Sequence, residues 1–206
     1  MIGYYNYTVI LTYIGTLSGF AGITFIWNGD VKTALICLMV AGFCDMFDGK
    51  IASTMERTVN EQRFGIQIDS LSDLVCFGVL PALIAFECSG GVALSAAASA
   101  IYLMCALIRL AWFNVDEEER QAGEGGRREV YLGLPVTSAA LLVPFAMGIG
   151  HAFDFPIDSF LPWLMLIIGA AFLAPFNLRK PGRKGQLLML ILGTAALAAV
   201  LLGGGI

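Results

Sequence analysis

Four aspartates lie inside long apolar stretches of this sequence, and they form two pairs. Asp45 and Asp48 are three residues apart, and Asp69 and Asp73 are four residues apart. On an α-helix, positions three or four apart share one face, so each pair presents both carboxylates in one direction. Ionisable side chains in apolar helices are costly, and they are typically functional or paired with a cation. The two pairs therefore predict one polar site contributed by two helices.

Four carboxylates at one site repel one another strongly unless a counter-charge is present. Ion pairing within a structural cluster is one solution, but Lys50, Arg57 and Arg63 are few and lie close to the connecting loop. A divalent cation is the better solution. We expect no histidine or cysteine close to the carboxylates, and an all-oxygen ligand set favours Mg²⁺ or Mn²⁺ over Zn²⁺.

The elements that must position these aspartates are membrane-spanning helices. Of the 206 residues, 58% are hydrophobic and 14% are charged, whereas about 25% of a soluble domain is charged. A helix needs about 20 apolar residues to span a bilayer. Segments of this kind lie near residues 8–27, 32–53, 65–88, 91–113, 132–153, 159–177 and 186–203. We therefore predict an all-α polytopic membrane protein, a bundle of about six to seven transmembrane helices forming a single domain over residues 1–206.

The basic residues predict the orientation of this bundle. All twelve Lys and Arg residues except Lys32 lie on alternate breaks between the segments. Cytoplasmic loops are enriched in Lys and Arg, so we expect a multi-pass cell-membrane protein with a cytoplasmic N-terminus. Asp48 lies six residues before the break over residues 54–63 and Asp69 six residues after it. Both pairs then lie about 9 Å from the cytoplasmic end of their helices, which puts the active site at the cytoplasmic side.

Other features of the composition exclude some functions. The formal net charge of −4 does not indicate a nucleic-acid partner. The five cysteines occur singly and without a CxxC pair, which is typical of buried apolar positions. The first residues lack the features of a cleavable signal peptide, so we expect the first segment to remain in the mature protein. A divalent-cation transporter is a distant alternative, because its acids are expected at the midplane of the membrane.

The aspartates belong to a longer pattern with small residues between them. This pattern resembles the signature of the CDP-alcohol phosphotransferases, membrane enzymes that move a phosphatidyl group from a CDP-activated lipid to an alcohol. The matching positions are Asp45, Asp48, Gly49, Ala52, Gly65, Asp69 and Asp73. The similarity covers roughly residues 8–150, and it implies a family core over about 8–177 with an additional helix near 186–203.

The resemblance implies a role for each matching residue. Asp45, Asp48 and Asp69 are expected to bind Mg²⁺ or Mn²⁺, with two ions in the site. Asp73 is expected to be the catalytic base and to contact the second ion. The residues expected to contact the CDP-lipid are Thr12, Thr16, Asp48, Gly49, Ala52, Ser53 and Gly65.

The sequence departs from the family pattern at one end of the motif. The family usually carries Arg after the Ala, where this chain has Ser53, and the stretch that follows is about three residues longer. That Arg helps to hold the nucleotide phosphates in the family. Lys50 or Arg57 are the residues that could replace it.

The flanking sequence indicates the acceptor alcohol. The stretches over 64–73, 77–82, 108–115 and 133–135 are most similar to family members that use serine. This resemblance implies CDP-diacylglycerol and serine as substrates and membrane lipids as surroundings. It leaves the oligomeric state open, with a homodimer as one option.

A serine acceptor carries a carboxylate that needs a cationic partner. Arg109 is the one basic residue well inside an apolar run, and its guanidinium could hold that carboxylate in a bidentate manner. Snorkelling to the head groups or pairing with an aspartate are the alternatives. Asn114 is a second candidate for serine contact. Glycerol phosphate or inositol phosphate is the other acceptor class, but a phosphate would require a cluster of basic residues and not Arg109 alone.

Overall fold

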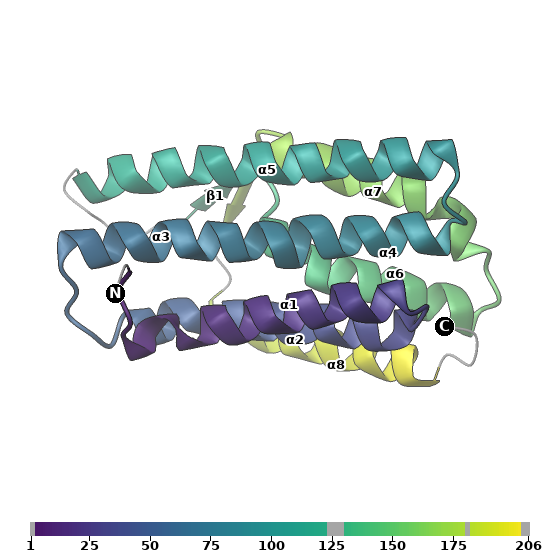
Figure 1. Cartoon of the computed structure of the whole chain (residues 1–206), viewed down its shortest axis with the longest axis horizontal. Coiled ribbons are helices and arrows are strands. Elements are labelled where there is room, and N and C mark those ends of the chain that lie inside the picture. Colours follow the sequence, from purple (N-terminus) through teal and green to yellow (C-terminus); the bar gives the residue numbers. More distant parts are fainter. Residues whose placement is uncertain (1–2, 123–129, 180–181, 203–206) are drawn as a thin grey trace.

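The computed structural model describes residues 3–122, 130–179 and 182–202. The helices run side by side along one axis and form an elongated bundle (Figure 1). In chain order the helical elements are η1 (Tyr7–Val9), α1 (Ile10–Trp27), α2 (Val31–Ala52), α3 (Val59–Asp73), η2 (Leu74–Val79), α4 (Leu80–Cys88), α5 (Ala93–Ala122), η3 (Val136–Ser138), α6 (Ala139–Ala152), α7 (Ile157–Leu173) and α8 (Arg183–Leu202). A short antiparallel pair of strands, β1 (Val130–Leu132) and β2 (Asn177–Arg179), joins the α5–α6 and α7–α8 connections.

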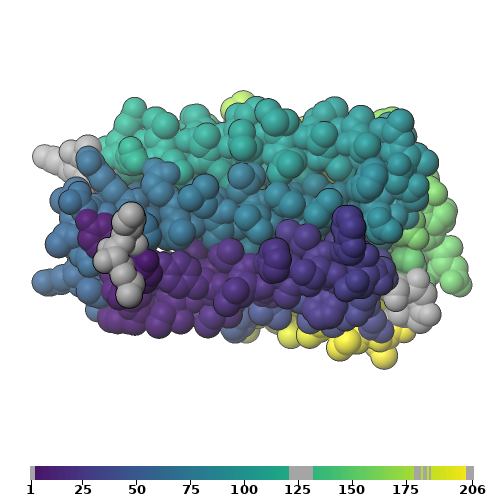
Figure 2. Space-filling view, in the orientation of Figure 1, coloured from purple at the N-terminus to yellow at the C-terminus, as the bar shows by residue number. Residues whose placement is uncertain are grey.

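The bundle has the apolar character of a protein in a bilayer. Three helical stretches of the described chain are long and apolar enough to cross a membrane, namely Tyr7–Trp27, Val59–Cys88 and Ala93–Arg120. Shorter apolar helices cover Val136–Ala152, Ile157–Leu173 and Leu187–Leu202. Large apolar side chains such as Leu17, Phe20 and Ile167 are exposed on the outside of the bundle. The helices α1, α3, α4 and α5 form the continuous face seen in Figure 2. The chain is therefore an integral membrane protein with an all-α spanning region, as predicted.

The alternating direction of the helices brings the polar connections together at two ends. The N-terminal segment and the α2–α3 connection meet at one end, where Tyr7 Oη and Thr54 Oγ1 are 3.0 Å apart. At the other end, Lys32 Nζ donates to the carbonyl of Leu201 at 2.9 Å. These contacts agree with the seven alternating segments expected from the sequence, if α3, η2 and α4 are counted as one rod.

Three boundaries differ from the expected spans by six residues or more. One of them is the start of α6, which lies at Ala139 and not near residue 132, because Val130–Leu132 form the strand β1. The third segment begins at Val59 and not near residue 65, because Thr58 and Glu61 form a capping box that starts the helix earlier. The fourth continues as α5 to Ala122 instead of ending near 113. Its last turns are stabilised by an ion pair between Glu117 and Arg120, three residues apart on the helix surface.

The rod formed by α3 and α4 contains a π-helical segment, η2, directly after Asp73. In it the N–H of Leu80 bonds to the carbonyl of Val75, five residues back. Pro81 follows and carries no N–H, so the regular hydrogen-bond ladder is interrupted here. The buried hydroxyl of Tyr102 on α5 donates to the carbonyl of Phe77 at 2.5 Å. This bond joins α5 to the irregular segment that follows the aspartates.

Replacing Tyr102 by Phe is expected to lower the stability of the folded protein. The substitution removes a buried hydrogen bond worth about 1 kcal/mol, which corresponds to roughly 2–4 °C in Tm for a chain of this size. Thermal unfolding in detergent measures the change. Tyr13→Phe is the control, because Tyr13 takes part in none of the hydrogen bonds found among the described residues. An equal shift in both variants would contradict the role given to Tyr102.

Helix α1 packs closely against the π-helical segment η2. A Cβ atom on Gly19 would lie 2.6 Å from Sγ of Cys76 in η2, so only glycine permits this approach. The consequence is that α1 lies directly beside the turn that follows Asp73.

Candidate active site

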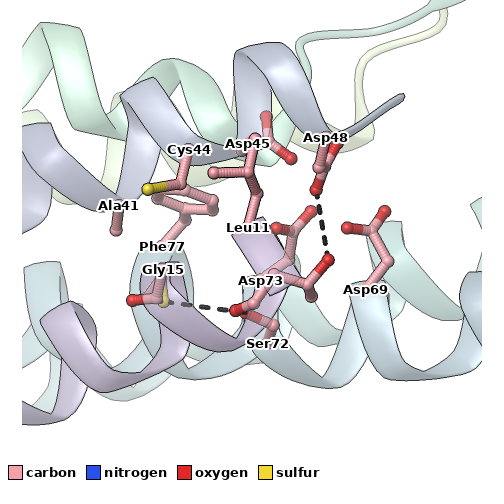
Figure 3. A pocket seen from close by; sticks show the side chains of 12 residues that line it. Leu11, Gly15, Ala41, Cys44, Asp45, Asp48, Asp69, Ser72, Asp73 and Phe77 are labelled. Atoms are coloured by element: carbon pink, nitrogen blue, oxygen red, sulfur yellow. Dashed lines mark hydrogen bonds between the residues drawn. The ribbon is translucent and has the colours of Figure 1, made fainter. Parts of the chain in front are cut away.

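The structure brings the four aspartates together in one pocket between α1, α2 and α3. Carboxylate oxygens of Asp45, Asp48 and Asp69 all lie within 4.8 Å of one another. Asp73 lines the same pocket, and in Figure 3 the side chains of Asp48, Asp69 and Asp73 point toward one another. The spacing within each helix placed both members of each pair on one face, and helix packing made the two faces meet.

The aspartates of α2 and α3 lie at different distances from the connection that joins the two helices. Asp48 lies four residues before the end of α2, whereas Asp69 is ten residues beyond the start of α3. The expected symmetry, six residues on either side of the break, is therefore not observed. The reason is that α3 begins earlier than expected and extends beyond the end of α2.

The pocket is narrow, with space of about 10 Å³, roughly that of a single water molecule. Its walls are mostly apolar or weakly polar. Besides the aspartates they consist of Leu11, Thr12, Gly15, Ala41, Cys44, Ser72, Cys76 and Phe77. The carboxylates therefore face one another across a small space, most of whose remaining walls cannot stabilise negative charge.

Two of these wall residues contradict one expectation. Cysteine was not expected close to the carboxylates, yet Cys44 and Cys76 line the pocket. The Cys76 thiol donates to the carbonyl of Gly15 at 3.3 Å. The group with the geometry of a metal site among the described residues consists of carboxylates alone, so the oxygen character of the ligand set is unchanged.

The electrostatics of the pocket favour a bound cation. None of the four aspartates forms an ion pair with a basic residue of the described chain. Two full negative charges about 4–5 Å apart repel by roughly 3–4 kcal/mol at an effective dielectric constant of 20. A divalent cation with oxygen ligands removes this repulsion, and the residues present fit such an ion.

Hydroxyl groups from α1 complete the polar part of the site. Thr12 Oγ1 donates to Asp48 Oδ2 at 3.5 Å. Thr16 lies one turn further along, where its hydroxyl contacts Ser72 at 2.7 Å and donates to the carbonyl of Thr12 at 2.8 Å. Thr12 thus lines the pocket, whereas Thr16 contacts it through Ser72. Sequence reasoning missed Ser72, although it follows Asp69 by three residues and so shares its face.

The other residues expected to contact the CDP-lipid lie beside the pocket, near the end of α2 and the start of α3. Gly49 is exposed, and a Cβ added to it would contact no atom of the described chain within 4 Å. Ala52 is half-buried, and the Ser53 hydroxyl donates to the carbonyl of Lys50 at 2.7 Å. None of these three residues lines the narrow pocket.

Gly65 lies one turn before Asp69, and a basic residue approaches it. A Cβ atom added to Gly65 would be 3.1 Å from Nη1 of Arg57. The guanidinium of Arg57 therefore lies next to the helix face that carries Asp69 and Asp73.

The two residues expected to bind serine are not among those that line the aspartate pocket. Arg109 is buried, with 6% of its surface exposed, and its Nε donates to the carbonyl of Leu134 at 3.3 Å. Its guanidinium also lies 5.2 Å from the centre of the Trp112 ring. Asn114 Oδ1 accepts a hydrogen bond from Ser70 at 2.5 Å. Both residues therefore take part in contacts between α5 and neighbouring segments.

Sequence reasoning also missed the N-terminal segment. Its residues contact the α2–α3 connection and the first turns of α3. Asn6 Nδ2 donates to Glu61 Oε1 at 3.4 Å, and the rings of Tyr4 and Phe64 meet edge to face. The polar and aromatic residues of 4–7 were the available signal. The segment lies at the same end of the bundle as the aspartate site.

An all-α membrane bundle with a pocket of four carboxylates is compatible with an integral membrane enzyme that uses divalent metal ions. The chain belongs to the CDP-alcohol phosphatidyltransferase family, whose profile matches residues 5–201. The match includes α8. Members of this family generally use divalent metal ions, with which the cluster of half-buried aspartates is compatible.

Curated proteins that are similar to this chain are named as serine O-phosphatidyltransferases or as an archaetidylserine synthase. The chain is 27% identical over 186 residues to a CDP-diacylglycerol–serine O-phosphatidyltransferase of Helicobacter pylori, covering 86% of this chain and 71% of the relative. It is 31% identical over 142 residues to the enzyme of the same name from Saccharomyces cerevisiae, covering 64% and 50%. It is 28% identical over 135 residues to an archaetidylserine synthase of Methanothermobacter thermautotrophicus, covering 65% and 54%. The chain thus spans only about half the length of the last two.

Proposed function

We propose that this chain is a CDP-diacylglycerol–serine O-phosphatidyltransferase. It transfers the phosphatidyl group of CDP-diacylglycerol to the hydroxyl of L-serine, and the products are phosphatidylserine and CMP. The observation that carries the proposal is the pocket in which α2 and α3 each contribute two aspartates. The family match and the names of the relatives support the same reaction.

Asp45, Asp48 and Asp69 are the residues that would hold the metal, Mg²⁺ or Mn²⁺, with two ions per site. When bound, the metal neutralises charge on the diphosphate of the donor and on the departing nucleotide. The three carboxylates come from two different helices, so their relative positions depend on the α2–α3 packing. Thr12 supports this set through its hydrogen bond to Asp48.

Asp73 is proposed as the general base. It takes the proton of the serine hydroxyl while the serine oxygen forms a bond to the phosphorus that carries diacylglycerol. The bond from this phosphorus to the bridging oxygen breaks, and its electron pair leaves with CMP. A base must come within about 3 Å of the proton that it removes. Asp73 lines the same pocket as the metal-binding carboxylates and lies one turn beyond Asp69, which supports this role.

The nucleotide is proposed to lie over the end of the pocket, against Gly49, Gly65 and the end of α2 at Ala52 and Ser53. Glycine at the first two positions lets a phosphate approach the backbone closely. Arg57 is our candidate for the cation that replaces the family Arg, because its guanidinium lies against Gly65. Lys50 is the alternative.

The orientation of the chain in the membrane and its domain organisation are proposals as well. The distribution of Lys and Arg supports a cytoplasmic N-terminus and a cytoplasmic active site. We propose that residues 1–206 form one domain.

Acceptor-dependent release of CMP tests the proposed function. The purified protein is incubated with CDP-diacylglycerol and Mg²⁺ or Mn²⁺, and CMP is measured with L-serine, glycerol phosphate or inositol phosphate as the acceptor. We expect release to depend on serine and phosphatidylserine to be formed in equal amount. Release that depends on a phosphorylated acceptor instead would contradict the serine assignment but not the reaction class.

Arg109 and Asn114 are proposed to contact serine, and Arg109→Gln tests the stronger of the two. Losing a charge-assisted contact to the serine carboxylate is worth roughly 2–3 kcal/mol, so KM for serine should rise about 30- to 150-fold. The KM for the CDP-lipid should change little. If the KM for serine stays constant while Tm falls, Arg109 acts through its bond to Leu134 and the serine contact is wrong.

A further inference from the structure

The rod formed by α3 and α4 changes from α-helix to π-helix directly after Asp73, at the wall of the aspartate pocket. The π-helical segment η2 begins at Leu74, and two of its residues, Cys76 and Phe77, line the pocket together with Asp73. Figure 3 shows Asp73 and Phe77 among the side chains around this space. π-Helical turns are rare, and they occur frequently at functional sites. Whatever holds this turn in its conformation therefore bears on the position of Asp73.

Pro81 deprives a backbone carbonyl of η2 of its usual partner within the helix. An N–H at position 81 would bond to the carbonyl of Phe77 in an α-helix, or to that of Cys76 in a π-helix. Proline has no N–H, so neither bond forms. Both residues are buried, and a buried carbonyl without a donor is costly. The fold therefore needs a donor from another helix at this point.

The donor is the hydroxyl of Tyr102 on α5, the helix that runs alongside the α3–α4 rod in Figure 1. Tyr102 Oη donates to the carbonyl of Phe77 at 2.5 Å, and the side chain of Tyr102 is fully buried. Its ring packs against Phe172 of α7, with the ring centres 5.5 Å apart. The contact with α7 thus keeps the Tyr102 hydroxyl at the carbonyl of η2.

A second proline of the chain shows the same arrangement far from the aspartates. Pro162 lies inside α7, so it cannot donate to the carbonyl of Asp158, four residues back. The hydroxyl of Ser89 donates to this carbonyl at 2.8 Å. Ser89 follows Asp73 by sixteen residues, which is about 24 Å further along the rod. The Ser89 bond is therefore a matched comparison, with the same kind of contact but no aspartate pocket beside it.

We propose that Tyr102 is a positioning residue for Asp73. Its hydroxyl holds η2 in the π-helical conformation, and this conformation directs the Asp73 carboxylate into the pocket. The inference rests on the proposed function, in which Asp73 takes the proton of the acceptor hydroxyl. Phe77 lies one helical turn after Asp73, so a shift of the Phe77 carbonyl moves the backbone that carries Asp73. A displacement of about 1 Å at a reacting group can cost about a hundredfold in rate.

Tyr102→Phe tests the proposal, with Ser89→Ala as the matched control. We expect Tyr102→Phe to lower kcat about tenfold, while the KM for the CDP-lipid and the affinity for Mn²⁺ change less than about threefold. Both substitutions remove one bond from a hydroxyl to a backbone carbonyl, so both should lower Tm. Ser89→Ala should nevertheless keep the kcat of the parent protein. An unchanged kcat in Tyr102→Phe, or an equal fall in both variants, overturns the proposal.

Pro81→Ala provides a second test, because it returns an N–H to the rod at position 81. In that background the new N–H can bond to the carbonyl of Phe77. Adding Tyr102→Phe should then lower kcat less than about threefold, instead of about tenfold as in the parent protein. An equal loss in both backgrounds would mean that Tyr102 acts through packing alone, and it would overturn the proposal.

Amide hydrogen exchange separates this proposal from the proposed function, because it needs no turnover. Exchange over residues 74–80 should be faster in Tyr102→Phe than in the parent protein, and Ser89→Ala should leave it unchanged. Unchanged exchange in Tyr102→Phe overturns the role of Tyr102. The kcat values are measured with whichever acceptor gives CMP release, so release with an acceptor other than serine contradicts only the serine assignment.

Discussion

Asp73→Asn is expected to lower kcat by about a thousandfold or more while the affinity for the CDP-lipid changes less than about threefold. The substitution keeps the size of the side chain but removes the group that takes the serine proton, and general-base catalysis contributes about 10²–10⁴ to the rate. Asp73 is not one of the three residues whose oxygens lie within 4.8 Å of one another. Metal and nucleotide binding should therefore be affected much less than turnover.

Single-turnover CMP release and equilibrium binding of a CDP-lipid measure the two quantities separately. Asp154→Asn is the control, because Asp154 lies in an exposed turn with positive φ that Asn also tolerates. If Asp73→Asn lost nucleotide affinity to the same extent as Asp45→Asn, Asp73 would be a metal ligand without a separate role as the base.

Removal of divalent metal is the second change with a very large expected effect. Excess chelator should abolish CMP release, and Mg²⁺ or Mn²⁺ should restore it, because the carboxylates of the pocket have no cationic partner among the described residues. Asp69→Asn should weaken metal binding and activity together. Full activity in excess chelator would exclude the metal site.

The metal can also be observed without turnover. Mn²⁺ has an electron paramagnetic resonance signal that reports binding directly, and titration of the wild-type protein should show saturable sites. Asp45→Asn, Asp48→Asn and Asp69→Asn should each weaken this binding by at least tenfold. If all three variants bound Mn²⁺ as tightly as the wild-type protein does, the metal would lie elsewhere.

Much of the architecture followed from local patterns. Apolar length predicted the spanning segments, because a backbone in hydrocarbon must satisfy its hydrogen bonds within its own helix. The spacing of Asp45 with Asp48 and of Asp69 with Asp73 predicted shared faces, because 3.6 residues per turn determines which side chains are neighbours. Thr58 and Glu61 form a capping-box sequence that also indicates where α3 begins. The apolar pattern alone placed the start of this helix too late in the sequence. The family profile agrees with the motif built on the four aspartates.

The contacts between helices were decided only by the tertiary structure. The approach of Gly19 to Cys76 lets α1 place Thr12 beside Asp48, and no local pattern specifies that distance. The rotation of α5 directs Nε of Arg109 toward the carbonyl of Leu134, a contact that the position of Arg109 in an apolar run could not predict. Which faces of two helices meet depends on how side chains far apart in the sequence fit together, and for that reason spacing along one helix cannot determine it.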